Sequence, residues 1–119
     1  SRFPFAPQRS AYSASKAAVN LLMASLRVEL RDEFPEIHTT TVLPGVVATE
    51  FGTNALHGGV DNRRLPNAQP VEEVAAVIAD AIEHPIAEVY TRPQMRELAA
   101  RYFAAEDVAE IERQFALPR

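Results

Sequence analysis

The sequence predicts an α/β protein in which parallel strands alternate with helices. Two short runs rich in β-branched residues, 37–43 (IHTTTVL) and 88–91 (EVYT), each follow a segment with helical periodicity. Strands that alternate with helices favour a parallel sheet with helices on both faces. A sheet of two such strands would leave both of its outer edges unpaired. We therefore expect neighbouring strands that are absent from these 119 residues.

The first predicted helix spans residues 11–34, a stretch without Gly or Pro in which apolar residues recur at helical spacing. Ser10 is placed to cap its first turn, and Pro35 is placed to end it. Residues 1–10 contain two prolines and no periodicity, and this indicates a loop.

Three further helices and one long loop are predicted downstream. Pro70 opens a helix with Glu72 and Glu73 in its first turn, and Pro85 ends it. Residues 93–104 and 106–116 are expected to form two short amphipathic helices. Residues 46–66 are rich in Gly and Asn and predict a long surface loop with one short helical turn.

Composition narrows the possible functions. The chain has 12 basic and 16 acidic residues, and this mild acidity argues against a nucleic-acid-binding surface. No apolar run approaches the roughly 20 residues of a membrane span. The chain has no cysteine, which excludes disulfides and thiol chemistry. The default expectation is a cytoplasmic protein. The first residues read as the middle of a loop without a targeting signal, which suggests a piece of a longer chain.

Tyr12 and Lys16 are the most informative pair of side chains. They are four residues apart on a predicted helix and therefore share one face, one turn apart. A free phenol has a pKa near 10, too high for efficient proton transfer at neutral pH, and a nearby ammonium lowers it. Lys16 is the only lysine of the chain. The pair is suited to moving a proton to or from a carbonyl or alcohol oxygen; the alternative is an exposed Tyr beside an exposed Lys.

Two longer segments place this pair in a known context. Residues 12–18 (YSASKAA) resemble the active-site helix of the short-chain dehydrogenase/reductase family. Residues 43–49 (LPGVVAT) resemble the P-G-x-V-x-T segment that follows a strand in that family. The resemblance covers residues 1–92. It implies the C-terminal part of a Rossmann-type doubly wound parallel sheet whose N-terminal dinucleotide-binding half is absent, followed by a helical extension over residues 93–119.

The resemblance also implies a reaction and a cofactor. Tyr12 would be the general acid/base, and Lys16 would bind the nicotinamide ribose and make the phenol more acidic. Pro44, Gly45, Val47 and Thr49 would hold the carboxamide of NAD or NADP. The substrate would be a small carbonyl or alcohol, and helix 11–34 would join subunits into a homodimer or homotetramer. The family's catalytic serine is expected upstream, and Ser1, 11 residues before Tyr12, is not assigned to that role.

Several alternatives stay open at this point. The chain could be a non-catalytic pseudoenzyme, or a fragment that acts as a dimerisation module. No metal site is expected, because the three histidines are far apart; a helix-end role, capping carbonyls, is favoured for His84. A solvated surface pair is favoured over an anion site for Arg63 and Arg64. The phenylalanines Phe3, Phe5 and Phe51 suit either a substrate pocket or the core, and the acidic residues Glu106, Asp107, Glu110 and Glu112 suit a solvated helix face.

Overall fold

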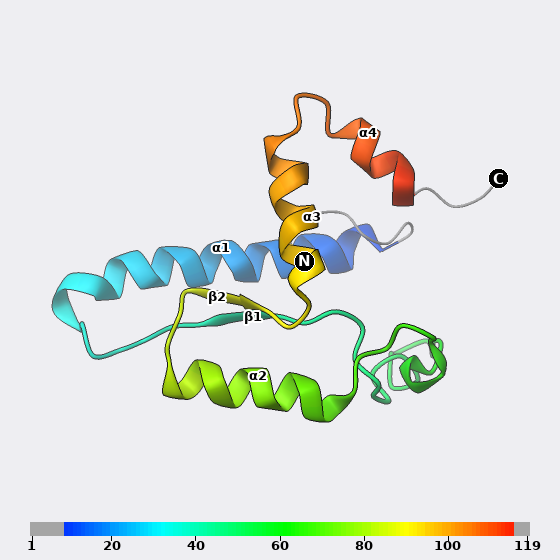
Figure 1. The fold of residues 1–119 in the computed structure, drawn as a ribbon, viewed down its shortest axis with the longest axis horizontal. Helices are drawn as coiled ribbons and strands as arrows, with labels where there is room; N and C mark the ends of the chain where they lie inside the picture. The colour runs from blue at the N-terminus through cyan, green and yellow to red at the C-terminus, as the bar shows by residue number, and fades with distance from the viewer. Residues whose placement is uncertain (1–8, 116–119) are drawn as a thin grey trace.

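The computed structural model describes residues 9–115, which form an α/β arrangement with a two-stranded parallel sheet (Figure 1). The elements in chain order are α1 (Ser10–Glu33), β1 (Thr41–Leu43), η1 (Asn62–Arg64), α2 (Val71–Glu83), β2 (Glu88–Tyr90), α3 (Pro93–Ala104), α4 (Ala109–Glu112) and η2 (Arg113–Phe115). The predicted alternation of helices and strands is confirmed in this part of the chain. None of the described helices has the length and apolar character needed to cross a membrane.

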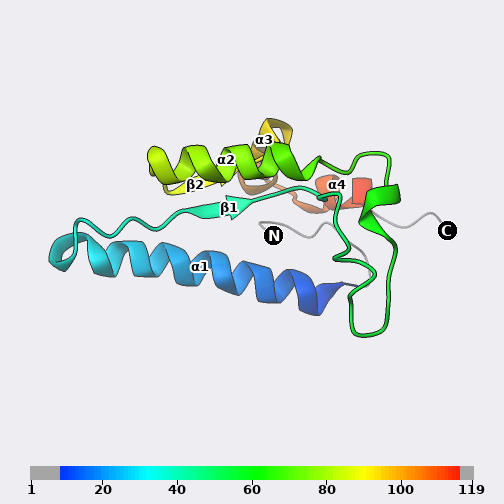
Figure 2. The ribbon, with the colours of Figure 1, turned by 90° about the horizontal axis from the view of Figure 1, so that it is seen from below.

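The sheet lies between α1 and α2, as two perpendicular views agree (Figures 1 and 2). β1 and β2 pair in parallel with Thr41 opposite Glu88 and Leu43 opposite Tyr90. The predicted first strand, residues 37–43, is shorter in the structure, because a strand forms only where a neighbour supplies hydrogen bonds. Residues 85–87 supply one such bond, from Thr41 N to Ala87 O at 3.0 Å, and Pro85 has no N–H to donate. Arg27 Nη1 instead donates to the carbonyl oxygens of Thr39 and Ala87, at 3.4 and 3.1 Å.

α1 begins one residue earlier than the sequence predicts. Arg9 is its N-cap residue and makes no side-chain capping bond, while Ser10 is already helical. The expectation that Ser10 caps the helix is therefore wrong. The backbone ladder starts with Ser13 N donating to Arg9 O at 2.9 Å, so Ser10 lies inside the first turn. The helix ends at Glu33, before Pro35.

The end of α2 corrects the role expected of His84. The helix ends at Glu83, and the backbone N–H of His84 donates to Asp80 O at 2.7 Å. Its imidazole Nδ1 lies 3.1 Å from the Asp80 carboxylate, so the ring pairs with a side chain one turn back and does not cap backbone carbonyls. Both side chains are exposed.

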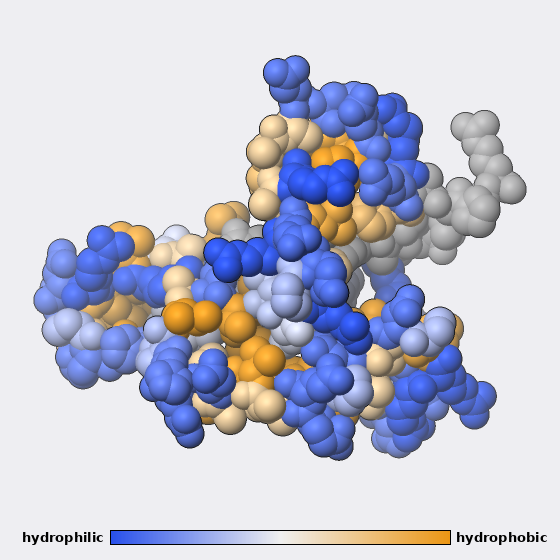
Figure 3. Space-filling model, viewed as in Figure 1, coloured by the Kyte–Doolittle hydropathy of each residue, from blue (hydrophilic) through white to orange (hydrophobic). Residues whose placement is uncertain are grey.

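Few apolar side chains are buried in this part of the chain. Val74, Ala81, Ala99 and Ile111 are the buried apolar residues, and no described side chain is completely buried. The accessible surface is 8923 Å² for 13.1 kDa, whereas a folded monomer of that mass exposes roughly 6,400 Å². Figure 3 shows apolar surface over α2 and the strands and again beside α3. The described elements alone therefore leave much apolar surface in contact with solvent.

A hydrogen bond joins the two C-terminal helices, α3 and α4. α3 has the predicted bounds, but α4 is a single turn that continues into η2, shorter than the predicted helix over 106–116, whose last residue lies outside the described part. Asp107 Oδ1 accepts from Ala109 N at 2.9 Å, which starts α4 late. The hydroxyl of Tyr102 donates to Glu112 Oε1 at 2.7 Å. Glu110 also lies 4.0 Å from Arg113 Nη2, so three members of the acidic run make specific contacts and the run is not a purely solvated face.

The bond between Tyr102 and Glu112 predicts an alkaline loss of stability. Donation to the carboxylate raises the pKa of Tyr102 above its usual value, because the neutral phenol is the form that donates. This contribution is complete below the ordinary tyrosine pKa and disappears as pH rises through the raised pKa. We expect Tyr102→Phe to lower the free energy of unfolding by about 1 kcal/mol at pH 7.

The measurement is thermal unfolding followed by circular dichroism at neutral and alkaline pH. The difference between the wild type and Tyr102→Phe should shrink above about pH 10. Tyr90→Phe is the matched control, because no hydrogen bond of its hydroxyl is formed within the described residues. A difference that stays constant across this pH range would contradict the assignment.

Candidate active site

The first turns of α1 bring Tyr12 and Lys16 onto one face of the helix, as their spacing predicts. The Lys16 ammonium lies 5.5 Å from the centroid of the Tyr12 ring, within the range of a cation–π contact. Tyr12 is 46% exposed, and within residues 9–115 its hydroxyl has no hydrogen-bond partner. Within residues 9–115, no carboxylate pairs with Lys16. The ammonium therefore remains available to a polar group brought in from outside.

Phe51 links this helix face to the segment that follows β1. Its ring meets the Tyr12 ring edge-on, with the centroids 6.4 Å apart and the planes at 61°. The sequence left Phe51 open between a substrate pocket and the core. The structure places it at the surface, 60% exposed, against Tyr12. This contact joins two segments that are far apart in the sequence.

The turn over residues 44–49 leaves the carboxyl end of β1 and is held from one side. Gln69 N donates to Val46 O at 2.7 Å, and Ala48 N donates to Gln69 O at 2.9 Å, which makes a parallel bridge between Val47 and Gln69. Thr49 N donates to Val47 O at 2.8 Å. The Val47 N–H has no partner among the described residues. Sequence reasoning missed Gln69, since one polar residue before a helix carries no local signal.

The other residues expected in this turn have distinct surroundings. Thr49 is half-buried, and its hydroxyl accepts from Phe51 N at 3.3 Å, so it also stabilises the turn that follows. Pro44 is exposed. Gly45 is half-buried beside Arg92, at a distance where a Cβ atom would make ordinary contact. Ser1, Phe3 and Phe5 lie outside the described residues.

Two features bring together the arms of the loop over residues 50–64, which follows this turn: the glycine at position 52 and the ion pairs of Arg63. A Cβ on Gly52 would overlap the Val60 carbonyl oxygen, so the two loop arms approach as closely as they do only because residue 52 is glycine. Asp61 accepts from the Arg63 backbone N at 3.0 Å and from Arg63 Nε at 2.9 Å, and Glu50 lies 2.9 Å from Arg63 Nη1. Arg63 lowers the pKa of Asp61 below its usual value. The predicted solvated arginine pair is thus exposed but already paired with acids.

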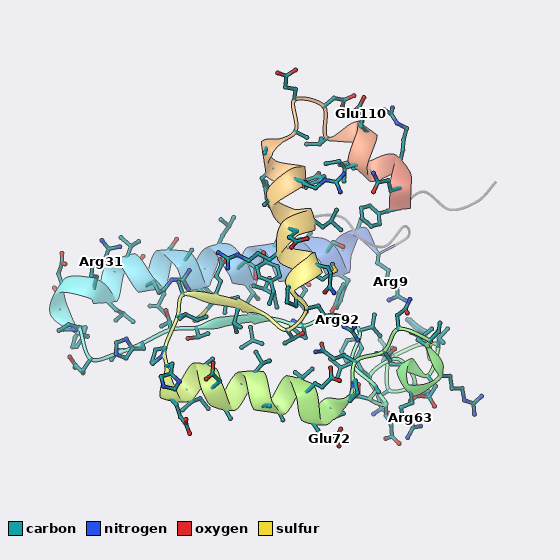
Figure 4. All side chains as sticks on the ribbon, viewed as in Figure 1. Arg9, Arg31, Arg63, Glu72, Arg92 and Glu110 are labelled. Atoms are coloured by element: carbon teal, nitrogen blue, oxygen red, sulfur yellow. The ribbon has the colours of Figure 1, made fainter. Side chains whose placement is uncertain are left out.

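The other charged side chains lie elsewhere. Figure 4 shows Arg31 at the end of α1, at the opposite end of the molecule from Arg63. Arg27, Arg31 and His38 line a cavity of about 270 Å³ near residues 85–87. This cavity lies beyond the amino ends of the strands, away from the turn over 44–49. Among the described residues, no group of three His, Cys, Asp or Glu could hold a metal ion.

Comparison with known proteins gives a consistent set of similarities. A model of the short chain dehydrogenase family matches residues 4–58, which contain both characteristic segments. The chain is 37% identical over 81 residues to dehydrogenase/reductase SDR family member 7B of Xenopus tropicalis, covering 64% of this chain and 26% of that protein. The Rattus norvegicus protein of that name is 35% identical over 82 residues, covering 64% and 24%. Dehydrogenase/reductase SDR family protein 7-like of Drosophila melanogaster is 44% identical over 52 residues, covering 44% and 15%.

These similarities cover only part of the length of the known proteins. The chain spans about a quarter of the length of the vertebrate relatives it matches. No solved structure matches it.

The charge cluster in the loop predicts an acid-sensitive contact. Because the pKa of Asp61 is lowered in the folded chain, its pairing with Arg63 is complete above the ordinary aspartate pKa and is lost as pH falls through the lowered value. We expect Asp61→Asn to speed hydrogen exchange at the Arg63 Nε–H at neutral pH, since the charged acceptor is gone. Nuclear magnetic resonance of that group measures the change.

The matched control is Glu50→Gln, which removes the outer contact of Arg63 and leaves both bonds to Asp61 in place. It should exchange at nearly the wild-type rate. Equal rates in the wild type and Asp61→Asn would show that the pair does not hold Arg63.

Proposed function

We propose that the chain belongs to the short-chain dehydrogenase/reductase family and is the C-terminal part of a Rossmann-type oxidoreductase domain. The reaction is hydride transfer between NAD or NADP and a small carbonyl or alcohol. We assign residues 1–92 to that domain and residues 93–119 to a C-terminal extension, whose described part, residues 93–115, is largely helical. The names of the relatives, all dehydrogenase/reductases, support the oxidoreductase class.

The observation that carries this proposal is the meeting of two segments at one place. Tyr12 and Lys16 lie one turn apart on α1, and Phe51, just beyond the turn over 44–49, contacts the Tyr12 ring. A proton-transfer pair thus lies close to a turn at the carboxyl end of a parallel strand. Ligands of open α/β sheets bind beyond these strand ends, so the location favours a cofactor and substrate here.

The chain's own groups fit the nicotinamide end of such a cofactor. The Val47 N–H has no partner among the described residues and is suited to donate to the carboxamide oxygen. The Lys16 ammonium has no carboxylate partner in that range and is suited to ribose hydroxyls. These residues do not provide a site for the pyrophosphate of the cofactor. A Gly-rich phosphate turn is not formed by the four glycines of the sequence, Gly45, Gly52, Gly58 and Gly59. That turn has to come from residues outside this sequence.

In the proposed reaction each side chain has a separate task. A nicotinamide held by these residues would supply or accept the hydride. During reduction the Tyr12 hydroxyl donates a proton to the carbonyl oxygen, and during oxidation the phenolate takes the proton from the alcohol. The positive charge of Lys16 favours that phenolate, and its amine holds the ribose. Phe51 lies beside the Tyr12 ring in an edge-on arrangement.

The packing supports a larger sheet than the two described strands. β1 pairs with β2 along one edge, and within the described residues its other edge has no strand partner. The accessible surface exceeds that of a compact monomer by more than a third. Additional strands beside β1 would cover apolar surface and satisfy the open edge. We propose that these strands belong to the dinucleotide-binding half of the domain, which this sequence does not contain.

A second candidate function is subunit association through α1, with or without catalysis. Leu21 and Val28 are seven residues apart and share one face of the helix, where they are 68% and 62% exposed. The small residues Ala14, Ala17, Ala18 and Ser25 lie on the same face and allow close approach of another helix. This face points away from Tyr12 by about half a turn. Homodimer or homotetramer formation would therefore leave the candidate site open.

The test of the proposed reaction is Tyr12→Phe in the full-length protein. Loss of the phenolic proton should reduce kcat by about 10²–10⁴ while cofactor affinity changes little. Steady-state kinetics with NADH and NADPH over a panel of aldehydes and ketones measures the first effect, and fluorescence titration measures the second.

Tyr90→Phe is the matched control and should keep the wild-type rate, because Tyr90 lies within β2. Near-normal turnover in Tyr12→Phe would refute the proton-transfer role. A wild-type protein that binds neither cofactor would favour the non-catalytic association function instead.

The test of association is Leu21→Glu. A carboxylate on the exposed apolar face should shift the protein from dimer or tetramer to monomer, which sedimentation velocity measures. Glu29→Gln, an exposed polar change on the same helix, is the control. An unchanged oligomeric state in Leu21→Glu would exclude this face as the interface.

A further inference from the structure

Gln69 joins two parts of the chain that the sequence does not connect. It is 3% exposed and makes hydrogen bonds in two directions. Its backbone bonds Val46 and Ala48 of the turn after β1. Its side-chain Nε2 donates to Thr91 O at 3.0 Å, while the Thr91 hydroxyl donates to Gln69 Oε1 at 2.7 Å. The carbonyl oxygen and one N–H of the Gln69 side-chain amide thus both form hydrogen bonds with Thr91.

Thr91 is itself fixed to the sheet. It directly follows β2 and is 8% exposed, and its backbone N donates to Leu43 O at the end of β1 at 3.3 Å. A closed path of bonds therefore runs from Leu43 through Thr91 and Gln69 to the turn over 44–49. The end of the sheet sets the position of that turn through this path.

The bridge also determines which backbone groups the turn presents. In a parallel bridge, a residue of one segment forms hydrogen bonds with the two residues that flank its partner in the other segment. The N–H and C=O of that partner residue point in the opposite direction. Val46 O and Ala48 N bond Gln69, so the Val47 N–H points away from it. Thr49 N donates to the Val47 carbonyl oxygen at 2.8 Å. Of the two backbone polar groups of Val47, the N–H is therefore the one that is available to a ligand.

We propose that Gln69 is a positioning residue for the nicotinamide, acting through its side-chain bonds to Thr91. This inference rests on the proposed function, in which the Val47 N–H holds the carboxamide. Without the amide of Gln69, the buried Thr91 hydroxyl and carbonyl would lose their partners, and the bridge would lose its anchor to β2. The Val47 N–H would then no longer be held in a fixed position beyond the carboxyl end of β1.

The decisive variant is Gln69→Met in the full-length protein, which keeps the length of the side chain and removes both bonds to Thr91. We expect the dissociation constants and KM values for NADH or NADPH to rise about tenfold, the loss typical of one misplaced hydrogen bond. The change in kcat should be smaller. Hydrogen exchange at the Ala48 amide, which bonds Gln69 O, should become faster.

Three other variants separate positioning from general stability. Gln94→Met changes an exposed glutamine of α3 and should leave affinity and Ala48 exchange unchanged. Thr91→Val removes the hydroxyl donor at similar volume and should weaken cofactor binding in the same direction as Gln69→Met. Thr91→Ser keeps the donor and should bind as the wild type does. If Gln69→Met fails to fold, the comparison of Thr91→Val with Thr91→Ser decides.

The outcomes distinguish this inference from the proposed function. If the wild type binds cofactor and both Gln69→Met and Thr91→Val bind it equally well, the positioning role is overturned and the proposed function stands. If these variants lose thermal stability while their cofactor affinity is unchanged, Gln69 is structural only, which also overturns the inference. If the wild type binds neither NADH nor NADPH, the proposed function falls and this inference with it.

Discussion

The parallel pairing of β1 with β2 is the constraint on which the rest of the structure depends. Each strand has three residues, yet their register brings Leu43 and Tyr90 side by side. The two segments that leave the carboxyl ends of the strands therefore start from neighbouring points. From there Thr91 and Gln69 can meet, and the turn over 44–49 is held beside them. A different register would separate these bonds and move the turn away from α1.

Polar contacts, more than an apolar core, hold the loops of this chain. Gln69 and Thr91 are buried and satisfy each other, which is the condition under which buried polar groups are tolerated. Asp61 and Arg63 perform a similar task in the surface loop, where the charges are screened by solvent. The apolar residues that normally supply most of the stability remain largely exposed on α1 and α2. This distribution is typical of elements that pack against further parts of a domain.

The sequence predicted the helices better than the strands and caps, for physical reasons. The long helix and α3 follow from local periodicity, and α3 begins at Pro93 as expected. The first strand is shorter than its β-branched run, because strand length depends on a partner far along the chain. Ser10 and His84 were misassigned because capping depends on where the backbone ladder starts and on which acceptor is nearest.

The sequence by itself determined the resemblance to the short-chain dehydrogenase/reductase family and the shared face of Tyr12 and Lys16, since a four-residue separation on a helix places two side chains on one face without help from the fold. Tertiary structure alone decided that Phe51 meets Tyr12, that Arg63 is paired with Glu50, and that Gln69 bonds both the turn and Thr91. These contacts join residues more than ten positions apart. Their geometry depends on how strands and loops pack in space, and no local pattern of residues encodes it.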